Sequence, residues 1–477
     1  MPDQHRGKVV PLFSRRATDA SARRIPIPTP VRNAKLAKLP AAYAARRVGG
    51  AGKRLLGRSA EEIGRDIQLR TAQHIFEVLG ELRGGAQKLG QILALTELTL
   101  PSGLAEPYRT ALSKLQDSGP SMLPSLVHDT MAANMGENWR QYFSTFDSSR
   151  AAAASIGQVH RAVWHDGTVV AVKVMYPGVR EALLNELRLL RSMAPMAGVV
   201  FPAADVRTAI DALCDYVGEE LDFQQEAHYQ RAFAAGYADD PDFLVPNVIE
   251  QQRDVLISEW VDAVPLNELI RTAPQEVRDR LGTQILRFVT SSYERTGYLY
   301  GDPHPGNFRR LPDGRLGVVD FGACSPYPAG FFALAHDIGE AILNGGDDEL
   351  NSALRQHGFV VPGQELDIEA ITASIAPFRE LFISPAVHLN RAWFIQQVNS
   401  LTEPRLSNVA RQMTVPGELI PSTRALILLF GALSQLGCTV SFRDEIVSGW
   451  PGLAEVLHRY QQRTESVAPV SQRSSPN

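Results

Sequence analysis

The feature that most constrains this chain is a loop-rich island, residues 299–325, inside a long helical pattern. Within it Asp302 is followed five residues later by Asn307, and a short apolar stretch then leads into an Asp-Phe-Gly tripeptide that begins at Asp320. Mg²⁺ is a hard cation that binds oxygen donors, which an aspartate carboxylate or an asparagine amide can supply. Handling a nucleotide phosphate also requires an acceptor for the nucleophile's proton. The island therefore predicts a site for phosphate chemistry.

A cation for the non-reacting phosphates lies upstream. A β-hairpin is predicted from strands Gln158–Trp164 and Thr168–Met175, which an Asp-Gly turn separates. The second strand contains the motif Val-Ala-Val-Lys, whose lysine is Lys173. A helical segment that follows it contains Glu226. Each motif alone is weak, because a lysine in a strand is usually solvent-facing. Their order and spacing together match the protein-kinase pattern.

That pattern assigns roles to five residues. Lys173 orients the α and β phosphates, and Glu226 holds Lys173 through an ion pair. Asn307 and Asp320 bind Mg²⁺, and Asp302 orients or deprotonates the attacking water or hydroxyl. The departures from the pattern matter as well. The Gly-x-Gly-x-x-Gly loop is replaced by an alanine-rich segment, residues 151–158, whose Cβ atoms restrict the approach of backbone N–H groups to phosphate.

With these departures the chain closely resembles the UbiB/AarF atypical kinase family, including the ADCK-type proteins of coenzyme Q biosynthesis, over about residues 60–455. Residues 88–91 match the family's KxGQ motif, residues 152–155 match its alanine-rich loop, and residues 220–222 match its ExD motif. The resemblance implies an α+β, protein-kinase-like bilobal fold, with a small β-sheet N-lobe, a helical C-lobe and an N-terminal helical extension that carries KxGQ.

The resemblance also implies further site residues. It implies that Lys88 and Gln91 of the KxGQ motif meet Glu220 and Asp222 of the ExD motif over the active site, and that these four residues gate it. The nucleotide is covered by Ala152, Ala153, Ala154 and Ser155 and touches the backbones of Glu259 and Val261. Ser258 stands where a bulkier gatekeeper is usual and is predicted to enlarge the adenine pocket, whereas Tyr300 stands where many members have histidine.

The function that the resemblance implies is binding of ATP or ADP with Mg²⁺, with ATPase activity that supports quinone or other isoprenoid-lipid metabolism at a membrane. Two alternatives stay open. One is a true kinase that phosphorylates a protein or a small-molecule hydroxyl. The other is a nucleotide-gated scaffold without useful turnover. The expected partners are a nucleotide, a prenyl lipid or quinone precursor, and enzymes of lipid biosynthesis.

The sequence divides into five segments. The expected units are a basic flexible arm at 1–60, a helical extension with KxGQ at 61–130, an N-lobe at 131–257, a helical C-lobe at 258–461 and a disordered tail at 462–477. Strands are expected at Phe243–Val248 and Asp254–Trp260 within the N-lobe.

Charge is distributed unevenly between these segments. Residues 1–60 contain 14 Lys and Arg and two acidic residues, so this arm carries +12 within a chain whose formal net charge is −4. The asymmetry predicts an anionic membrane surface as the arm's partner; no specific nucleic acid is expected. The first thirty residues lack the apolar core of a secretory signal. The uncharged stretch Ala425–Phe442 favours a buried helix over a spanning one. The expected location is cytoplasmic, peripheral to the inner face of the membrane.

Overall fold

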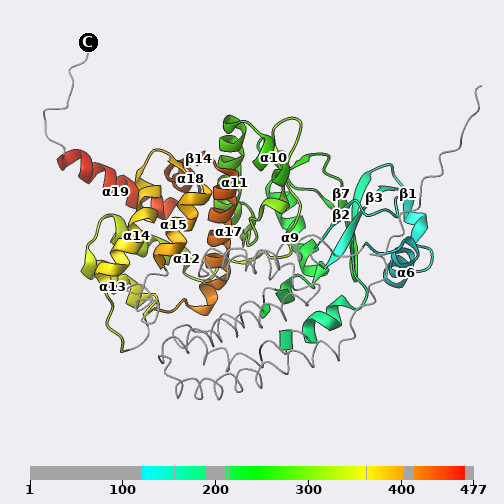
Figure 1. Ribbon diagram of the computed structural model, residues 1–477, viewed down its shortest axis with the longest axis horizontal. Coiled ribbons are helices and arrows are strands. Elements are labelled where there is room, and N and C mark those ends of the chain that lie inside the picture. Colours follow the sequence, from blue (N-terminus) through cyan, green and yellow to red (C-terminus); the bar gives the residue numbers. More distant parts are fainter. Residues whose placement is uncertain are drawn as a thin grey trace, which may run out of the picture.

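The computed structural model describes residues 121–154, 156–185, 187–188, 191, 211, 214–215, 217–360, 363–401 and 413–467. These residues form a smaller lobe built on a β-sheet and a larger, mainly helical lobe (Figure 1). Helix α9 (Phe223–Gly236) lies between them, packing against β6 of the smaller lobe and against α11 of the larger one. The α+β, kinase-like bilobal architecture expected from the motifs is confirmed.

The N-lobe sheet has the order β1-β3-β4-β7-β6, with β2 added beside β3. Its strands are antiparallel to their neighbours: β1 (Phe143–Phe146), β2 (Ala152–Ala153), β3 (Gly157–Trp164), β4 (Val169–Met175), β6 (Val248–Gln252) and β7 (Val255–Glu259). The β3–β4 hairpin is the predicted one. Its turn uses Gly167 at φ 95°, a conformation that costs glycine little.

Alternation along β4 separates the core of the N-lobe from its cleft. Val170, Val172 and Val174 are fully buried with Met131 and Trp139. Burying each valine contributes about 1.5–3 kcal/mol to folding. Because successive side chains of a strand point to opposite faces, Lys173 projects from the other face, toward the larger lobe.

Helix α6 (Pro124–Met135) supplies the cover of that core. It packs on β4 and β7 through Val127 and Met131, which are fully buried. The helix therefore belongs to the N-lobe, and it crosses the boundary expected between residues 130 and 131.

The strand expected at Phe243–Val248 was wrong. The structure divides it into β5 (Phe243–Leu244) and β6, which begins at Val248. β5 pairs in parallel with β11 (Leu316–Val318) of a separate four-stranded sheet, ordered β5-β11-β10-β8. Pro246, which has no N–H to donate to a ladder, lies where the chain passes from one sheet to the other.

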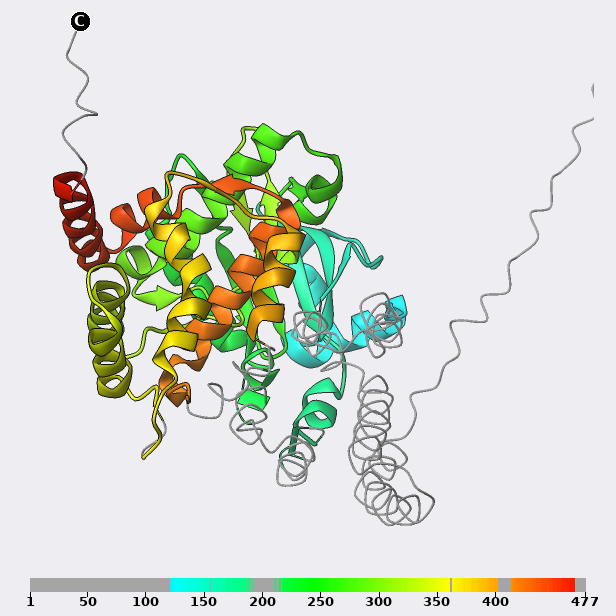
Figure 2. The same cartoon turned by 60° about the vertical axis from the view of Figure 1, so that its left-hand side comes forward.

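The C-lobe is organised around the long helix α11 (Gln275–Thr296), which contacts α9, α17 and α18. Its other helices are α10 (Leu266–Thr272), α12 (Phe331–Leu343), α13 (Asp347–Gln356), α14 (Ile368–Ile383), α15 (Arg391–Leu401), α17 (Ile420–Leu436), α18 (Phe442–Gly449) and α19 (Pro451–Val467). In Figure 2 the orange α17 runs beside the yellow helices of this lobe. Its aromatic core joins Phe233, Phe288 and Phe321.

The long uncharged stretch expected to be one buried helix is interrupted. Helix α17 ends at Leu436, because Gly437 takes a left-handed conformation at φ 62°, and α18 begins only at Phe442. Among the described residues, the helical run Gly417–Leu436 is the one long and apolar enough to cross a membrane, and 56% of its most apolar 18-residue stretch is buried within the protein.

Helix α19 runs to Val467, beyond the boundary expected at residue 461. Arg463 anchors this last part, donating hydrogen bonds to the carbonyl oxygens of Asn344 (2.6 Å) and Leu343 (3.0 Å) at the end of α12.

Candidate functional site

The predicted lysine–glutamate pair forms. Lys173 on β4 donates to both carboxylate oxygens of Glu226 on α9, at 2.6 and 2.9 Å. Its Nζ also lies 3.5 Å from Oδ2 of Asp320, so one ammonium joins strand, helix and Asp-Phe-Gly segment. Asp320 follows β11 and accepts a hydrogen bond from the N–H of Gly322 (3.1 Å). Three segments far apart in sequence therefore meet at one point.

The burial of these groups sets their charges. Glu226 is nearly inaccessible, whereas the side chain of Asp320 is 26% exposed and faces the cleft. Burial opposes the charged form of Lys173, but the carboxylates of Asp320 and Glu226 outweigh it and raise the pKa of the ammonium. Burial raises the pKa of Glu226 to about 7, with Lys173 opposing the shift. Lys173 is accordingly a fixed cation at neutral pH.

The second part of the site lies on the loop between β9 (Tyr298–Leu299) and β10 (Phe308–Arg310). Asn307 Nδ2 donates to the backbone oxygen of Asp302 (2.9 Å) and to its Oδ2 (3.1 Å). The backbone of Asn307 accepts from the N–H of Val319, which ties this loop to the residue before Asp320. Asp302 is 5% exposed. Hydrogen bonds therefore hold Asp302 and Asn307 together beside the Asp-Phe-Gly segment, while the roles assigned to them stay predictions.

The Mg²⁺ assigned to this site can be judged from the donor chemistry. Within the described residues, no group of three or more His, Cys, Asp or Glu side chains is suited to hold a metal. Mg²⁺ at phosphate sites is typically held by one or two carboxylates, with water and phosphate oxygens completing its shell. Asp320 is partly exposed, and the amide nitrogen of Asn307 is engaged with Asp302, which leaves the amide oxygen as its donor toward a cation. The residues fit a Mg²⁺–phosphate complex.

The alanine-rich loop forms a tight hairpin. β2 pairs with β3 so that Ala152 lies opposite Val159, and the N–H of Ala154 donates to the oxygen of Gly157 at 3.0 Å. Val159 in turn lies opposite Lys173 on β4, so the loop begins beside this lysine. Ala153 forms part of β2, and Ser155 lies outside the described residues.

The segment expected to contact adenine begins at Glu259, the last residue of β7. Glu259 Oε2 accepts from the backbone N–H (2.8 Å) and the side-chain amide (3.0 Å) of Asn247. Its carboxylate is therefore committed to bracing this segment, which leaves nucleotide contact to the backbone. Val261 packs near Gly317 on β11, where a Cβ would lie 3.1 Å from Val261 Cγ1.

Half of the predicted gating set is described. Glu220 is buried, at 7% exposure, just before α9. Asp222 is the N-cap of α9, and its carboxylate accepts from the N–H groups of Gln224 and Gln225, both at 3.0 Å. This cap fixes the first turn of the helix that carries Glu226. Lys88 and Gln91 lie outside the described residues, so their meeting with Glu220 and Asp222 stays a prediction.

Sequence reasoning missed Arg424, on α17. This largely buried arginine donates to the carbonyl oxygen of Ala323 (3.3 Å) and lies 3.7 Å from Glu219. It therefore holds Ala323, three residues after Asp320, in place. A single arginine at the start of an otherwise apolar helix was the available signal, because a buried guanidinium requires partners.

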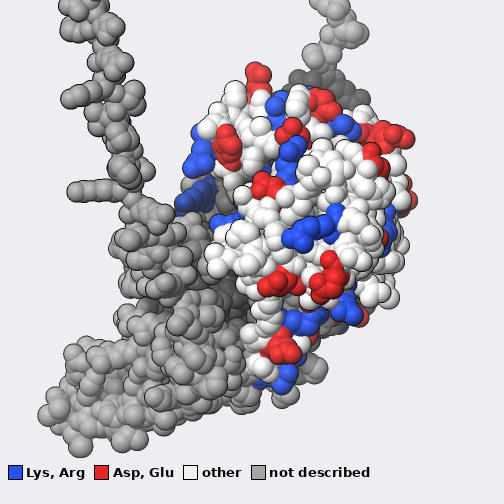
Figure 3. Space-filling model, turned by 90° about the vertical axis from the view of Figure 1, so that its right-hand side faces the viewer, with Lys and Arg blue, Asp and Glu red and all other residues white. Residues whose placement is uncertain are grey.

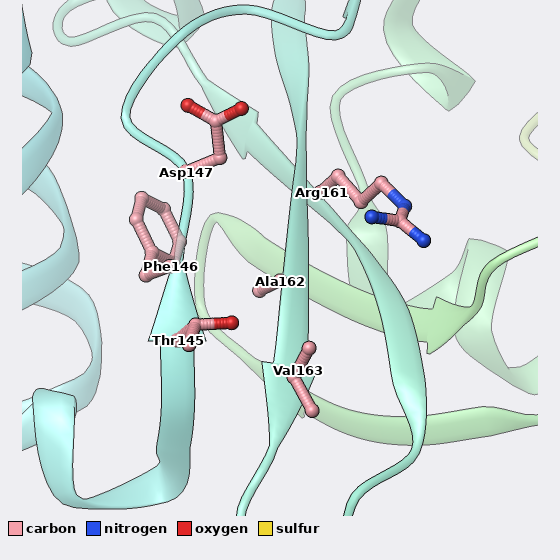
Figure 4. A pocket seen from close by; sticks show the side chains of 6 residues that line it. All are labelled: Thr145, Phe146, Asp147, Arg161, Ala162 and Val163. Carbon is pink, nitrogen blue, oxygen red and sulfur yellow. The ribbon is translucent and has the colours of Figure 1, made fainter.

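The described residues also form a shallow hollow of about 220 Å³ at strands β1 and β3 of the N-lobe. Figure 4 shows its lining side chains, from β1 and β3 and the residue after β1: Thr145, Phe146, Asp147, Arg161, Ala162 and Val163. Asp147 and Arg161 point away from each other in this view. Neither Lys173 nor Asp320 lines the hollow, so it is separate from the predicted phosphate site.

Comparisons with known proteins agree with this geometry. A model of the ABC1 atypical kinase-like domain matches residues 114–351. A chloroplast protein of Arabidopsis thaliana, activity of bc1 complex kinase 3, is 36% identical over 281 residues, which are 57% of this chain and 38% of that protein. The mitochondrial atypical kinase COQ8 of Saccharomyces cerevisiae is 32% identical over 263 residues, or 54% of this chain and 51% of the yeast protein. The chain thus spans about half or less of these two relatives.

Similarity to a solved structure extends further. A Mycobacterium tuberculosis protein, solved as a complex with erythromycin, is 37% identical to this chain. The match covers 83% of this chain and 100% of the mycobacterial one, with a TM-score of 0.61.

Proposed function

Because the chain belongs to the UbiB/ADCK family of ABC1 atypical kinase-like proteins, we propose that it binds a nucleotide with Mg²⁺ in the cleft between its lobes and hydrolyses ATP or transfers its γ-phosphate. The observation that carries the proposal is the contact of Lys173 with Glu226 at 2.6 Å and with Asp320 at 3.5 Å. A nucleotide site needs a fixed cation next to an oxygen ligand for the metal. Charged groups that are buried together beside a cleft are candidates for such a functional site.

Each residue has a defined task in this proposal. Lys173, held by Glu226, binds the α and β phosphates, and Asp320 and Asn307 hold Mg²⁺, which would neutralise charge on the phosphate oxygens. Asp302 orients the attacking oxygen and accepts its proton. The hydrogen bonds from Asn307 keep the Asp302 carboxylate in one orientation. The alanine-rich hairpin covers the phosphates.

Thermal unfolding with and without Mg-ATP or Mg-ADP tests the site. We expect both nucleotides to raise the melting temperature of the wild type, because a ligand that binds only the folded state stabilises it. Asp320→Asn should lose most of that rise. Asp313→Asn, in the exposed turn between β10 and β11, is the matched control and should retain it. An unshifted wild type, or an Asp320→Asn variant stabilised as fully as wild type, contradicts the proposal.

The useful reaction is proposed to be ATP hydrolysis that supports the handling of a quinone precursor or another prenyl lipid at a membrane. This rests on the family and on relatives named atypical kinase COQ8. Purified protein should hydrolyse ATP faster when liposomes or phenolic quinone precursors are added. Transfer of labelled phosphate to a defined acceptor would instead support the true kinase. Function that survives Asp302→Asn in cells would support the nucleotide-gated scaffold.

A second candidate ligand comes from the mycobacterial structure, which contains erythromycin and matches 83% of this chain. We propose that this chain also binds erythromycin or another macrolide. Calorimetric titration with erythromycin, in the presence and absence of Mg-ADP, tests this. If erythromycin binds under neither condition, macrolide binding is a property of the mycobacterial protein and not of this chain.

A further inference from the structure

Arg161 lies on the cleft face of the N-lobe sheet. In the β3–β4 register Val159 is opposite Lys173 and Arg161 is opposite Ala171. Residues directly opposite in an antiparallel pair share a face, as do residues two apart on one strand. Arg161 therefore shares the face of Lys173, whereas its neighbour Ala162 is buried in the core on the other face.

The position of Arg161 along the cleft follows from the next strand. Ala171 lies opposite Ser258 on β7, while Lys173 lies opposite Leu256. The row that contains Arg161, Ala171 and Ser258 is thus two residues, or about 7 Å, closer to the segment 259–261 than the row that contains Lys173. Under the proposed function the phosphates lie at Lys173 and the base at residues 259–261. Arg161 therefore stands at the base end of the site.

The chemistry of Arg161 suits a flat aromatic ligand. The residue is exposed, and its Cζ lies 5.7 Å from the centre of the Trp260 ring. Among the carboxylates of the described chain, none forms an ion pair with it, and it points away from Asp147, the acidic residue that lines the same hollow (Figure 4). A planar guanidinium stacks on aromatic faces and is more weakly hydrated than an ammonium.

We propose that Arg161 is a specificity-determining residue that binds the purine base of the nucleotide, stacking its guanidinium on the base while Trp260 holds it in place. The inference rests on the proposed nucleotide site and deepens it. Lys173 supplies the charge for the phosphates, and Arg161 supplies recognition of the base at the opposite end. The alternative contact, between Arg161 and the phosphates, is separated from this one by the experiment.

The test compares two ligands, Mg-ATP and Mg-tripolyphosphate, the second of which has the phosphates without base or ribose. Isothermal titration measures both with wild type, Arg161→Ala and Arg161→Lys. We expect Arg161→Ala to bind Mg-ATP about 2–5-fold more weakly, from the size of an exposed cation–π contact, and to bind Mg-tripolyphosphate as wild type does. Arg161→Lys should lie between wild type and alanine for Mg-ATP, because an ammonium keeps the charge but lacks the flat stacking surface.

The matched control is Arg140→Ala. Arg140 is also exposed, with its Cζ 4.7 Å from the centre of the Trp139 ring, but it lies in the short helix Trp139–Tyr142, which contacts β1 and α6. It should change neither affinity. Unchanged Mg-ATP binding in Arg161→Ala overturns the inference, and so does an equal loss for both ligands, which would assign Arg161 to the phosphates. A wild type that binds neither ligand overturns the proposed function itself, and the inference with it.

Discussion

At the scale of single residues, the covering loop depends on a close approach between strands. A Cβ placed on Gly157, at the start of β3, would lie 2.2 Å from the carbonyl oxygen of Val174. Real Cβ atoms do not approach backbone oxygen so closely, so any side chain here must push β3 away from β4. The strand that would move contains Lys173.

We therefore expect Gly157→Ala to lower the free energy of unfolding by about 1–3 kcal/mol, the usual cost of overpacking. It should also weaken Mg-ATP binding, because the loop and Lys173 shift relative to each other. Urea unfolding and titration with Mg-ATP measure the two effects. Gly417→Ala, where a Cβ meets no atom within 4 Å, is the control and should change neither. Wild-type behaviour of Gly157→Ala would show that the strands separate at no cost.

His160 is the centre of a polar chain behind the same loop. It is fully buried; its Nδ1 donates to the backbone oxygen of Asp147 (3.0 Å), so its Nε2 accepts from Gln158 (2.8 Å). Gln158 Oε1 in turn accepts from the N–H of Met122 (3.0 Å). A neutral ring satisfies both contacts of His160, whereas a protonated ring cannot accept from Gln158.

Burial lowers the pKa of His160 below its ordinary value of 6.5. The unfolded chain therefore takes up a proton first, as pH falls below 6.5, and stability that is complete above that pH is lost as pH falls toward the folded pKa. We expect the melting temperature of wild type to decline between pH 6.5 and 5, and part of this decline to vanish in His160→Asn. His165→Asn, at an exposed position, should keep the wild-type slope. Equal slopes in all three proteins would contradict the role of His160.

At the scale of elements, α9 is the part that connects the lobes. Its first turn contains Glu226, four residues after the N-cap Asp222, so the position of the Lys173–Glu226 ion pair depends on where this helix begins. The carboxylate of Asp222 caps α9 in the structure. The family resemblance implies a second role for it, in gating the active site.

Two substitutions separate these roles. Asp222→Ala removes the cap and should destabilise the protein by about 0.5–2 kcal/mol, whereas Asp222→Asn should preserve it, since asparagine caps helices as well as aspartate does. Differential scanning calorimetry measures stability, and ATP hydrolysis measures the site. If Asp222→Asn keeps stability but changes ATP hydrolysis, the charge acts in gating. If Asp222→Asn is as destabilised as Asp222→Ala, capping is not what stabilises α9.

At the scale of the whole molecule, charge is separated between segments of the chain. On the face of the molecule shown in Figure 3, Lys and Arg side chains are interspersed with Asp and Glu over the described residues. The concentrated positive charge lies in residues 1–60, with 14 basic and two acidic side chains. An anionic membrane attracts such a segment with about 1 kcal/mol per well-placed basic residue, and salt screens the attraction.

Deletion of residues 1–55 is therefore expected to reduce binding to vesicles of anionic phospholipid by at least about 100-fold if three or more basic side chains engage the surface. Binding to neutral vesicles and the thermal shift with Mg-ADP should not change. Vesicle sedimentation at low and at high salt measures this. If the truncated protein sediments with anionic vesicles as wild type does, the arm is not the membrane contact.

The kinase-like character of the site could be predicted from the amino-acid sequence alone. The order of Lys173, Asp302, Asn307 and Asp320 identified the kinase-like site, because phosphate chemistry restricts residue type and spacing. Two strand-forming stretches separated by an Asp-Gly turn also predicted the β3–β4 hairpin, whereas the face of β4 that bears Lys173 was not predicted.

Features that depend on contacts between distant segments could be seen only in the folded molecule. The tertiary structure split the expected strand 243–248 between two sheets, assigned α6 to the N-lobe, capped α9 with Asp222 and placed Arg161 beside Trp260 on the cleft face. The contacts of Arg424 and Arg161 could not be predicted, because a charged residue in a local sequence pattern is usually solvent-exposed. Whether it serves a site depends on which elements the fold brings beside it, and local periodicity does not contain that information.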